Sequence, residues 1–261
     1  MKLFIIKIGG NVLDNPEALK RFLSDFAQIK EPKILIHGGG KIATKIGDQL
    51  GIESKYVNGR RITDAQTIDV VTMVYGGLVN KQIVAALQTL NCNAIGLTGA
   101  DGNLIKATKR PVKDIDYGFV GDVKADGVNT VFLHALLNQN VVPVFAPLTH
   151  ADGSILNTNA DTIASVLAVA MSKIFEVRLI YCFEKRGVLM DVNQADSVIT
   201  HLPKNLYDDL LTKSVFADGI LPKLENAYDA IHSGVKEVLI GEATDLLKNT
   251  GAKTEGTLIT L

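Results

Sequence analysis

The sequence has no tryptophan, only two cysteines and only five histidines among its 261 residues. Cys92 and Cys182 form no C-x-x-C pair, and so few cysteines predict buried free thiols in a reducing compartment rather than a disulfide framework. The histidines are scattered along the chain and form no H-E-x-x-H or similar pattern. These shortages argue against a Cys/His metal site and against a cysteine nucleophile, and we assign no metal ligand.

Long runs of charge or of apolar residues are also absent. The net charge is −1, and no Lys/Arg cluster is long enough to predict a nucleic-acid partner or an anionic membrane surface. No apolar stretch approaches the roughly 18 residues that span a bilayer, and no basic segment precedes an apolar one as in a signal peptide. We therefore expect a cytoplasmic protein with small-molecule partners, and neither a nucleic-acid nor a membrane partner.

The composition is that of a globular protein with a sizeable core. With 47% hydrophobic and 21% charged residues, a chain of this length can form one large domain or two lobes. Short apolar runs typical of buried strands occur at residues 3–8, 33–37, 93–98, 141–145, 177–183, 236–240 and 256–260. Helical segments alternate with them at residues 16–29, 41–50, 130–139, 159–172, 203–212, 222–233 and 244–249.

This alternation predicts an α/β fold with a mainly parallel sheet and helices on both of its faces. No linker separates two domains, and the softest boundary lies near residues 173–177. Thr63–Gln66 resembles a capping box that opens a long helix to about Leu87, in which Gly76-Gly77 should weaken the helix unless something packs closely there. The turn signals that favour hairpins are Asp101-Gly102, Gly118, Gly121, Asp126-Gly127 and Asp152-Gly153.

Two glycine clusters follow predicted strands. Lys7-Ile8-Gly9-Gly10 follows the first strand, and His37-Gly38-Gly39-Gly40 follows the second. Glycine lets backbone N–H groups approach an anion closely, so two such turns and one lysine predict a cradle for a phosphoryl group. Neither cluster has the spacing of a Walker P-loop. A surface lysine and a flexible turn are the simpler alternatives, and His37 is better explained as a packed strand-end residue than as a base.

Three further segments carry polar groups at predicted helix starts. The arginines of Asn58–Thr63 precede a helix N-terminus, which repels cations, so they predict an anion such as a carboxylate. Asn157–Asp161 contains two Asn and one Asp, more than a single helix cap requires, and Asn can both donate to and accept from an amide. Lys223 lies in the first turn after Asp218–Pro222, where a bound anion explains it best.

Taken in chain order, these segments resemble the amino acid kinase family, and within it the branch that phosphorylates N-acetylglutamate. The resemblance rests on Ile6–Gly10, Ile36–Gly40, Asn58–Thr63, Gly118–Gly121, Leu156–Asp161, Asp218-Gly219 with Lys223, and Gly256-Thr257. The glycine motifs are shared across the family, whereas Asn-Gly-x-Arg-x-Thr and Asn-x-Asn-Ala-Asp are more particular to that branch. The resemblance covers nearly the whole chain.

The resemblance implies a three-layer α/β/α sandwich around a central, mostly parallel sheet of about eight strands. It implies one domain over residues 1–261, with an N-terminal lobe (about 1–175) for the acylated amino acid and for dimerisation, and a C-terminal lobe (about 176–261) for ATP with Mg²⁺. The implied reaction transfers the γ-phosphoryl group of ATP to the side-chain carboxylate of N-acetyl-L-glutamate, in arginine biosynthesis.

The resemblance also implies roles by position. Lys7 and Lys223, from opposite lobes, would stabilise charge on the moving phosphoryl group, and Asp161 would orient both lysines. The implied substrate-binding residues are Gly39 and Gly40, Arg61 at the α-carboxylate, Asn157 at the acylated amine, and Asn159. The implied nucleotide-binding residues are Gly9, Gly10, Glu184, Lys185, Arg186, Gly187, Val188, Leu189, Val215, Phe216 and Ala217.

Some features differ from those of relatives. Where relatives usually have Ser-Asp-Val-x-Gly, this chain has Phe183–Gly187, so its adenosine contacts there do not follow from the motif. Arg60 stands where a relative has an apolar residue. Relatives inhibited by arginine carry an extra N-terminal helix before the first strand, whereas the first predicted strand of this sequence begins at residue 3. We therefore expect an arginine-insensitive homodimer whose long N-lobe helix, with Gly76-Gly77, lies at the interface.

A carboxylate acceptor is already ionised at neutral pH, because its ordinary pKa is about 4.3, so the reaction needs no general base. Catalysis then depends on in-line positioning and on charge neutralisation. Three alternatives stay open at this point. The acyl group could be succinyl, with Arg60 on its extra carboxylate. The acceptor could be a carbamate, a nucleotide or aspartate. The chain could also be a non-catalytic sensor that retains the fold.

Overall fold

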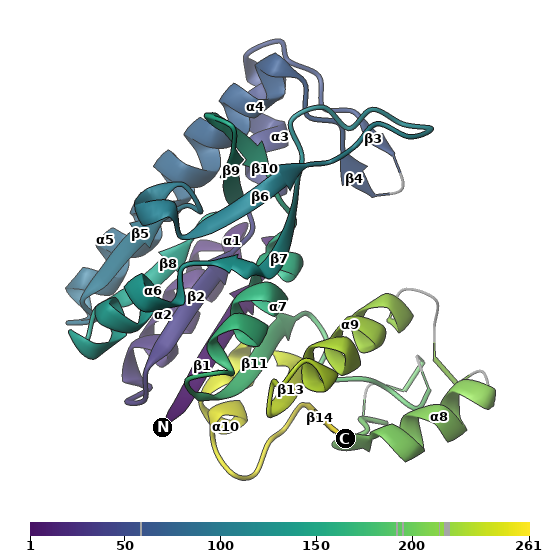
Figure 1. The fold of residues 1–261 in the computed structure, drawn as a ribbon. Coiled ribbons are helices and arrows are strands. Elements are labelled where there is room, and N and C mark those ends of the chain that lie inside the picture. Colours follow the sequence, from purple (N-terminus) through teal and green to yellow (C-terminus); the bar gives the residue numbers. More distant parts are fainter. Residues whose placement is uncertain (58, 192, 195, 214, 217–219) are drawn as a thin grey trace. The chain divides into compact units, whose positions relative to one another are not determined.

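Buried strands and helices alternate along the chain, and most of the strands belong to one sheet (Figure 1). The computed structural model describes residues 1–57, 59–191, 193–194, 196–213, 215–216 and 220–261. The eight strands follow the order β12 (His201–Pro203), β14 (Thr257–Thr260), β13 (Glu237–Glu242), β11 (Glu176–Phe183), β1 (Lys2–Ile8), β2 (Lys33–His37), β8 (Val142–Phe145) and β5 (Ala94–Leu97). The pairings recorded between these strands are parallel except for that of β13 with β14. The predicted α/β fold with a mostly parallel sheet of about eight strands is confirmed.

Contacts within the chain divide it into two compact units. The first unit comprises Met1–Lys33 and Ala164–Leu261, and the second comprises Ile34–Ile163. This contact division differs from the lobes expected from the sequence, because it joins the N-terminal strand to the C-terminal part. Lys7 and Lys223 both belong to the first unit of this division, while the two lobes stay a prediction. Which part of the chain binds which ligand stays a prediction.

The first unit is built on β12, β14, β13, β11 and β1. Its helices are α1 (Gly10–Leu13), α2 (Pro16–Gln28), the end of α7 (Ala160–Met171), α8 (Lys204–Thr212), α9 (Leu221–His232) and α10 (Leu246–Thr250), with the 3-10 turn η3 (Ala243–Asp245) before α10. The sequence predicts the start of α2 correctly: the Asn15 side chain accepts from the N–H groups of Glu17 and Ala18, and Pro16 is the first helical residue. Helix α9 packs on β13 and β14.

The second unit contains β2, β8 and β5 and two smaller sheets. Its helices are α3 (Gly40–Gln49), α4 (Ala65–Val71), the π-helix η1 (Thr72–Val79), α5 (Asn80–Thr89), the 3-10 turn η2 (Asp101–Asn103), α6 (Thr130–Asn138) and the first turn of α7. The smaller sheets are formed by β10 (Ser154–Asn157), β9 (Leu148–Ala151), β6 (Ile105–Lys109) and β7 (Gly121–Val128), and by β3 (Tyr56–Val57) with β4 (Arg60–Arg61). Helices α5 and α6 pack on β8.

The Asp-Gly pairs have different outcomes. Asp152 and Gly153 both have positive φ, 48° and 77°, and they join the antiparallel strands β9 and β10, as predicted. The prediction of a turn at Asp126-Gly127 is wrong, because both residues lie inside β7, opposite a shift in register between Ile105 and Ala107. A Cβ on Gly127 would come within 2.6 Å of a backbone oxygen of β6, so this position of the β-bulge requires a glycine.

The long helix predicted after residue 63 is present, with a π-helical middle. Its N-cap is Asp64, one residue after the Thr63 expected from the capping box, and the Asp64 side chain accepts from the Thr67 N–H. Gly76 has the close packing that the sequence required, since a Cβ there would lie 3.3 Å from Cδ1 of Leu148. A Cβ on Gly77 would meet no atom of the described residues within 4 Å.

This same helical run, Ala65–Thr89, has 25 residues, and its most apolar stretch of 18 residues has a mean hydropathy of 1.4. Among the described residues it alone is long and apolar enough to cross a membrane by length and composition, a test that core helices of soluble proteins also pass. The sequence did not single it out, because polar residues interrupt its apolar stretch. Of the residues in that stretch 44% are buried, and they include Val71, Ile83 and Leu87.

Candidate active site

The glycine turn after β2 shapes one cavity of the second unit. Gly39 is the N-cap of α3 and has a φ of 152°, a conformation that side chains rarely adopt. A Cβ at Gly39 would also lie 2.9 Å from Cδ1 of Tyr75, whereas one at Gly40 would meet nothing within 4 Å. Because Gly39 has no side chain to cap α3, the N–H groups of the first turn are suited to a bound anion.

Arg61 is held firmly beside this turn. Its Nη2 donates to the carbonyl oxygen of Gly40 at 2.8 Å and to Oγ1 of Thr44 at 2.9 Å, and its Nη1 donates to Oγ of Ser54. The guanidinium also lies 4.8 Å from the centre of the Tyr56 ring. Arg61 is buried, so its direction is set by these contacts rather than by solvent. A fixed and partly desolvated guanidinium is the group expected to bind a carboxylate bidentately.

Asn157 and Asn159 end β10 and begin α7, and they have different partners. The Asn157 side chain donates to Oγ1 of Thr63 at 3.0 Å, so its oxygen is not used in that bond. The Asn159 side-chain oxygen accepts from the N–H groups of Asp161 and Thr162 at 2.8 and 3.1 Å. Asn159 is therefore the cap of α7, an ordinary structural role for an asparagine at this position.

These residues line a cavity of about 240 Å³ that lies within the second unit. Its lining includes Gly38, Gly39, Gly40, Tyr56, Arg60, Arg61, Tyr75, Arg110, Tyr117, Asn157 and Asn159. Arg110 is paired with Asp122 at 2.6 Å, which leaves Arg61 and the more exposed Arg60 as the cations suited to a ligand. The structure thus brings together all five residues assigned to substrate binding.

The two lysines assigned to catalysis lie near each other in the first unit. Nζ of Lys7 lies 5.6 Å from the centre of the Phe183 ring, and Nζ of Lys223 lies 3.7 Å from it. The two ammonium groups are therefore no farther apart than the sum of these distances. A Cβ on Gly9 would lie 3.7 Å from Nζ of Lys7, so the Lys7 ammonium group lies beside the first glycine turn.

A second cavity, of about 370 Å³, lies within the first unit at the end of β11. It is lined by Phe183, Glu184, Lys185, Gly187, Val188, Leu189, Val215, Ile220, Lys223 and Ile240. Its volume suits a small ligand, and its apolar side chains with two ammonium groups, those of Lys185 and Lys223, suit a purine base joined to phosphates. Gly9 and Gly10 line an adjoining hollow that shares Phe183 and Glu184.

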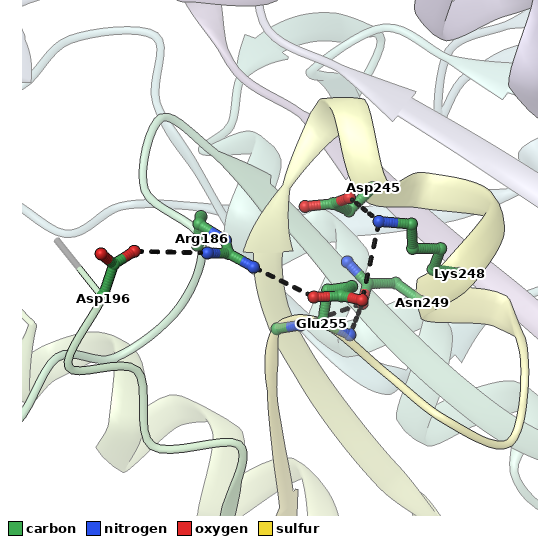
Figure 2. A network of polar contacts seen from close by, with 7 residues as sticks. Arg186, Asp196, Asp245, Lys248, Asn249 and Glu255 are labelled. Carbon is green, nitrogen blue, oxygen red and sulfur yellow. Dashed lines mark hydrogen bonds and ion pairs between the residues drawn. The ribbon is translucent and has the colours of Figure 1, made fainter.

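Two residues assigned to the nucleotide, Arg186 and Phe216, have other positions. Arg186 does not line the cavity but pairs with Glu255 at 3.0 Å and with Asp196 at 3.5 Å (Figure 2). Phe216 is buried and stacks on the Tyr207 ring. Ala217 lies outside the described residues, as do Asn58, Asp218 and Gly219 of the motifs. Figure 2 shows that Glu255 also contacts Lys248, which in turn contacts Asp245.

Asp161 lies in the first turn of α7. Its expected role in orienting the lysines stays a prediction. Within the described part of the chain, no three His, Cys, Asp or Glu side chains gather as a metal site would require. Mg²⁺ usually keeps water ligands and binds through one or two carboxylates plus substrate phosphates, so a magnesium ion bound to ATP does not require such a cluster.

Burial shifts the pKa values of two groups near these cavities. The pKa of His37 falls to about 4 because desolvation opposes its charged form, and this outweighs the hydrogen bond to Gly38. The pKa of the Cys182 thiol rises to about 12, chiefly through burial and despite the nearby Lys7. Neither group can therefore serve as a base or a thiolate nucleophile at neutral pH.

Several contact residues gave no signal in the sequence. Tyr56 and Tyr75 are single aromatic residues with no motif around them, yet one stacks on Arg61 and the other packs against Gly39. Thr44 was detectable in principle, because it lies one helical turn after Gly40 and its hydroxyl donates to the Gly40 oxygen.

The sequence model described as the amino acid kinase family matches residues 2–242. The chain belongs to the amino acid kinase family. An acetylglutamate kinase of Cytophaga hutchinsonii is 57% identical to this amino acid kinase over 249 residues, which are 95% of this chain and 94% of that relative. An acetylglutamate kinase of Parabacteroides distasonis is 55% identical over 97% of this chain and 98% of the relative.

A solved structure with the same fold is that of N-acetylglutamate synthase from Neisseria gonorrhoeae, complexed with coenzyme A and N-acetyl-glutamate. It aligns with this amino acid kinase at a TM-score of 0.82 and 21% identity, over 99% of this chain and 59% of that chain. At this identity the likeness concerns the fold alone.

Proposed function

We propose that this amino acid kinase transfers the γ-phosphoryl group of ATP to the side-chain carboxylate of N-acetyl-L-glutamate, as a step of arginine biosynthesis. The observation that carries the proposal is the 57% identity to an acetylglutamate kinase over 95% of this chain and 94% of that relative. The chemistry of the two cavities supports it. One offers a fixed guanidinium beside a glycine turn, and the other offers apolar walls with two lysines.

In the proposed reaction, Arg61 binds the α-carboxylate and Asn157 the acylated amine. The side-chain carboxylate is the nucleophile and needs no base, since its ordinary pKa is about 4.3. This agrees with a site whose nearest histidine, His37, is buried and neutral. Lys7 and Lys223 neutralise charge on the transferred group, while Gly39 and Gly40 donate N–H groups to it. Magnesium, when bound, adds further neutralisation of the ATP phosphates.

We assign ATP to the first unit and the acyl-amino acid to the second, on the lining of the two cavities. Glu184, Lys185, Gly187, Val188, Leu189 and Val215 are proposed as nucleotide contacts. Gly9 and Gly10 are proposed as phosphate contacts, because Lys7 lies beside them. Asp161 is proposed to orient the lysines. The homodimer and the cytoplasmic location expected from the sequence stay predictions, and light scattering of the purified chain tests the former.

The proposal is tested by ADP release from Mg²⁺, ATP and N-acetylglutamate. We expect turnover by the natural chain, and a fall in kcat of about two orders of magnitude or more in Lys7→Ala and in Lys223→Ala, the loss typical of one electrostatic donor. Lys20→Ala, which removes an exposed lysine of α2, is the matched control and should retain kcat. Near-normal kcat in both lysine variants would remove the proposed mechanism.

The same assay separates the alternatives. Binding of both ligands without ADP release would identify a sensor and overturn the kinase proposal. A higher kcat/KM on N-succinylglutamate than on N-acetylglutamate would overturn the choice of acyl group but keep the reaction. A strong preference for the acetyl substrate supports the proposal as stated.

A further inference from the structure

A histidine without a part in the proposed reaction lies directly before the glycine turn. His37 ends β2 and is 0% exposed. Its Nδ1 lies 2.6 Å from the carbonyl oxygen of Gly38, and its Nε2 lies 3.1 Å from Nδ2 of Asn80. Asn80, the first residue of α5, is 1% exposed. Two buried polar side chains thus connect the long helix to the turn that lines the substrate cavity.

The partners of Asn80 determine where the imidazole carries its proton. Nδ2 of Asn80 lies 2.9 Å from the carbonyl oxygen of Val144, which can only accept a hydrogen bond. The amide nitrogen therefore faces both Val144 and His37, and it donates to each. Because Nε2 of His37 must accept, the ring proton is on Nδ1 and is donated to Gly38.

The bond to Gly38 sets the direction of the next peptide group. The carbonyl and the N–H of a trans peptide point in opposite directions, so a Gly38 oxygen held at His37 turns the Gly39 N–H away from His37. The other two carbonyls of the turn are also engaged. Gly39 accepts from the Ala43 N–H at 2.9 Å, and Gly40 accepts from Arg61 at 2.8 Å. All three carbonyl oxygens are thus held by the protein itself.

The long helix supports the turn at a second point. Tyr75, in the π-helical segment η1, packs so closely on Gly39 that a Cβ there would lie 2.9 Å from its ring. Asn80 follows directly after this segment. Room for Asn80 depends on a glycine in β5, because a Cβ on Gly96 would come within 1.9 Å of the Asn80 oxygen. A π-helix inside an α-helix is frequent at functional sites, and here it sets the spacing of these two contacts.

We infer that His37 and Asn80 are positioning residues, which aim the N–H groups of the glycine turn at the transferred phosphoryl group by holding the Gly38 carbonyl oxygen. This inference rests on the proposed function, because the turn has a phosphoryl group to bind only in that reaction. Burying two polar side chains is costly unless every group is paired. Here the imidazole, the amide and the carbonyl oxygens of Gly38 and Val144 are paired with one another by hydrogen bonds. The low pKa of His37 keeps the ring neutral and so preserves this pattern at neutral pH.

Two single variants test the inference. The side-chain amide of His37→Asn can take the place of Nδ1 and still donate to Gly38, whereas that of His37→Gln reaches the place of Nε2 and leaves Gly38 without its donor. We expect His37→Gln to lower kcat about tenfold to hundredfold, with KM for N-acetylglutamate changed less than about threefold, as for one misaimed electrostatic donor. His37→Asn should stay within about threefold of the natural kcat.

Equal kcat in the two variants would overturn the inference, and so would a loss that appears in KM alone. Thermal unfolding of both variants shows whether each is folded. A measurement on the unaltered chain covers the case in which neither variant folds. In ¹⁵N NMR of its histidines, we expect one that stays neutral well below pH 6 with the proton on Nδ1. A proton on Nε2 of His37 would overturn the inference.

Failure of the proposed function and failure of the inference about His37 give different results. If the natural chain does not turn over N-acetylglutamate, the proposed function fails, whatever tautomer His37 has. If the natural chain turns over and His37→Gln does too at the natural rate, the inference fails and the proposed function stands.

Discussion

Gly39 occupies a backbone position that a larger residue can reach only with strain. Its φ of 152° is rare for side-chain-bearing residues, and the Tyr75 ring fills the space in which a Cβ would lie. Its neighbour Gly40 lies at the helical start of α3 and has open space around it. Two adjacent glycines therefore have different reasons for being glycine.

We predict that Gly39→Ala lowers the free energy of unfolding by about 1–3 kcal/mol, from backbone strain and the contact with Tyr75. Gly40→Ala is the matched variant and should change it by less than about 0.5 kcal/mol, or raise it, because alanine favours a helix. Urea unfolding at neutral pH measures both. Equal losses would show that the turn, rather than the conformation of Gly39, limits substitution.

At the scale of the elements, the start of α4 depends on Asp64. The pKa of Asp64 is lowered, first by the hydrogen bond from the Thr67 N–H, so the ionised form caps the helix better than the neutral one. A lowered folded-state pKa means that this stabilisation is present above the ordinary pKa of aspartate. It is lost as the pH falls through the folded-state pKa.

We predict that Asp64→Ala lowers the free energy of unfolding by about 1 kcal/mol at pH 7, the usual value of an N-cap. The difference from the natural chain should shrink as the pH falls below about 3.9. Asp69→Ala, an exposed carboxylate on the same helix, is the control and should have little effect. A difference for Asp64→Ala that does not depend on pH would contradict the capping role of the charged form.

Two arginines of the first unit connect its elements. They differ in burial, and so they should differ in how much their ion pairs contribute to stability. Arg178 is 4% exposed and contacts Glu237 at 2.6 Å and the carbonyl oxygens of Asn249 and Gly251 at 2.8 Å each. Arg186, in the network of Figure 2, has a side chain that is 45% exposed. Solvent weakens the second set of ion pairs much more than the first.

We therefore predict that Arg178→Met lowers the free energy of unfolding by about 3 kcal/mol, because it leaves a partly buried carboxylate and two carbonyl oxygens without their donor. Arg186→Met should lower it by about 1 kcal/mol or less, and less still at high salt. Denaturant unfolding at two salt concentrations measures both. A larger loss for Arg186→Met would mean that the exposed network governs the stability of this unit.

At the scale of the whole molecule, each cavity is lined by residues of a single unit. The sequence order does not show this, because the first unit is assembled from both ends of the chain. A ligand stabilises the native structure that binds it, by about 2.7 kcal/mol at one hundred times its Kd. Each ligand should therefore protect its own unit.

We predict that a non-hydrolysable ATP analogue slows amide hydrogen exchange at residues 183–189 of the first unit. N-acetylglutamate should slow exchange at residues 38–44 and 59–63 of the second unit. Hydrogen-exchange mass spectrometry with each ligand alone measures both effects, with L-glutamate as the control for the acyl group. Protection of residues 183–189 by N-acetylglutamate alone would contradict the assignment of the ligands.

Much of the site was predictable, because its residues lie at strand ends and helix starts that short motifs mark. Gly39, Gly40, Arg61 and Asn157 were named from such motifs, and they line one cavity. Arg186 was named with its neighbours, but its side chain pairs with Glu255 in the network of Figure 2. Only packing shows which members of the run reach the cavity.

The sequence by itself determined the order of strands and helices, the family and the residues that carry charge. Apolar periodicity and helix caps are local, so they can be read along the chain. Only the tertiary structure decided that Met1–Lys33 joins Ala164–Leu261, that Tyr75 limits Gly39, and that Asn80 orients His37. These are contacts between residues far apart in the chain, and they depend on close packing and on paired buried polar groups rather than on any local pattern.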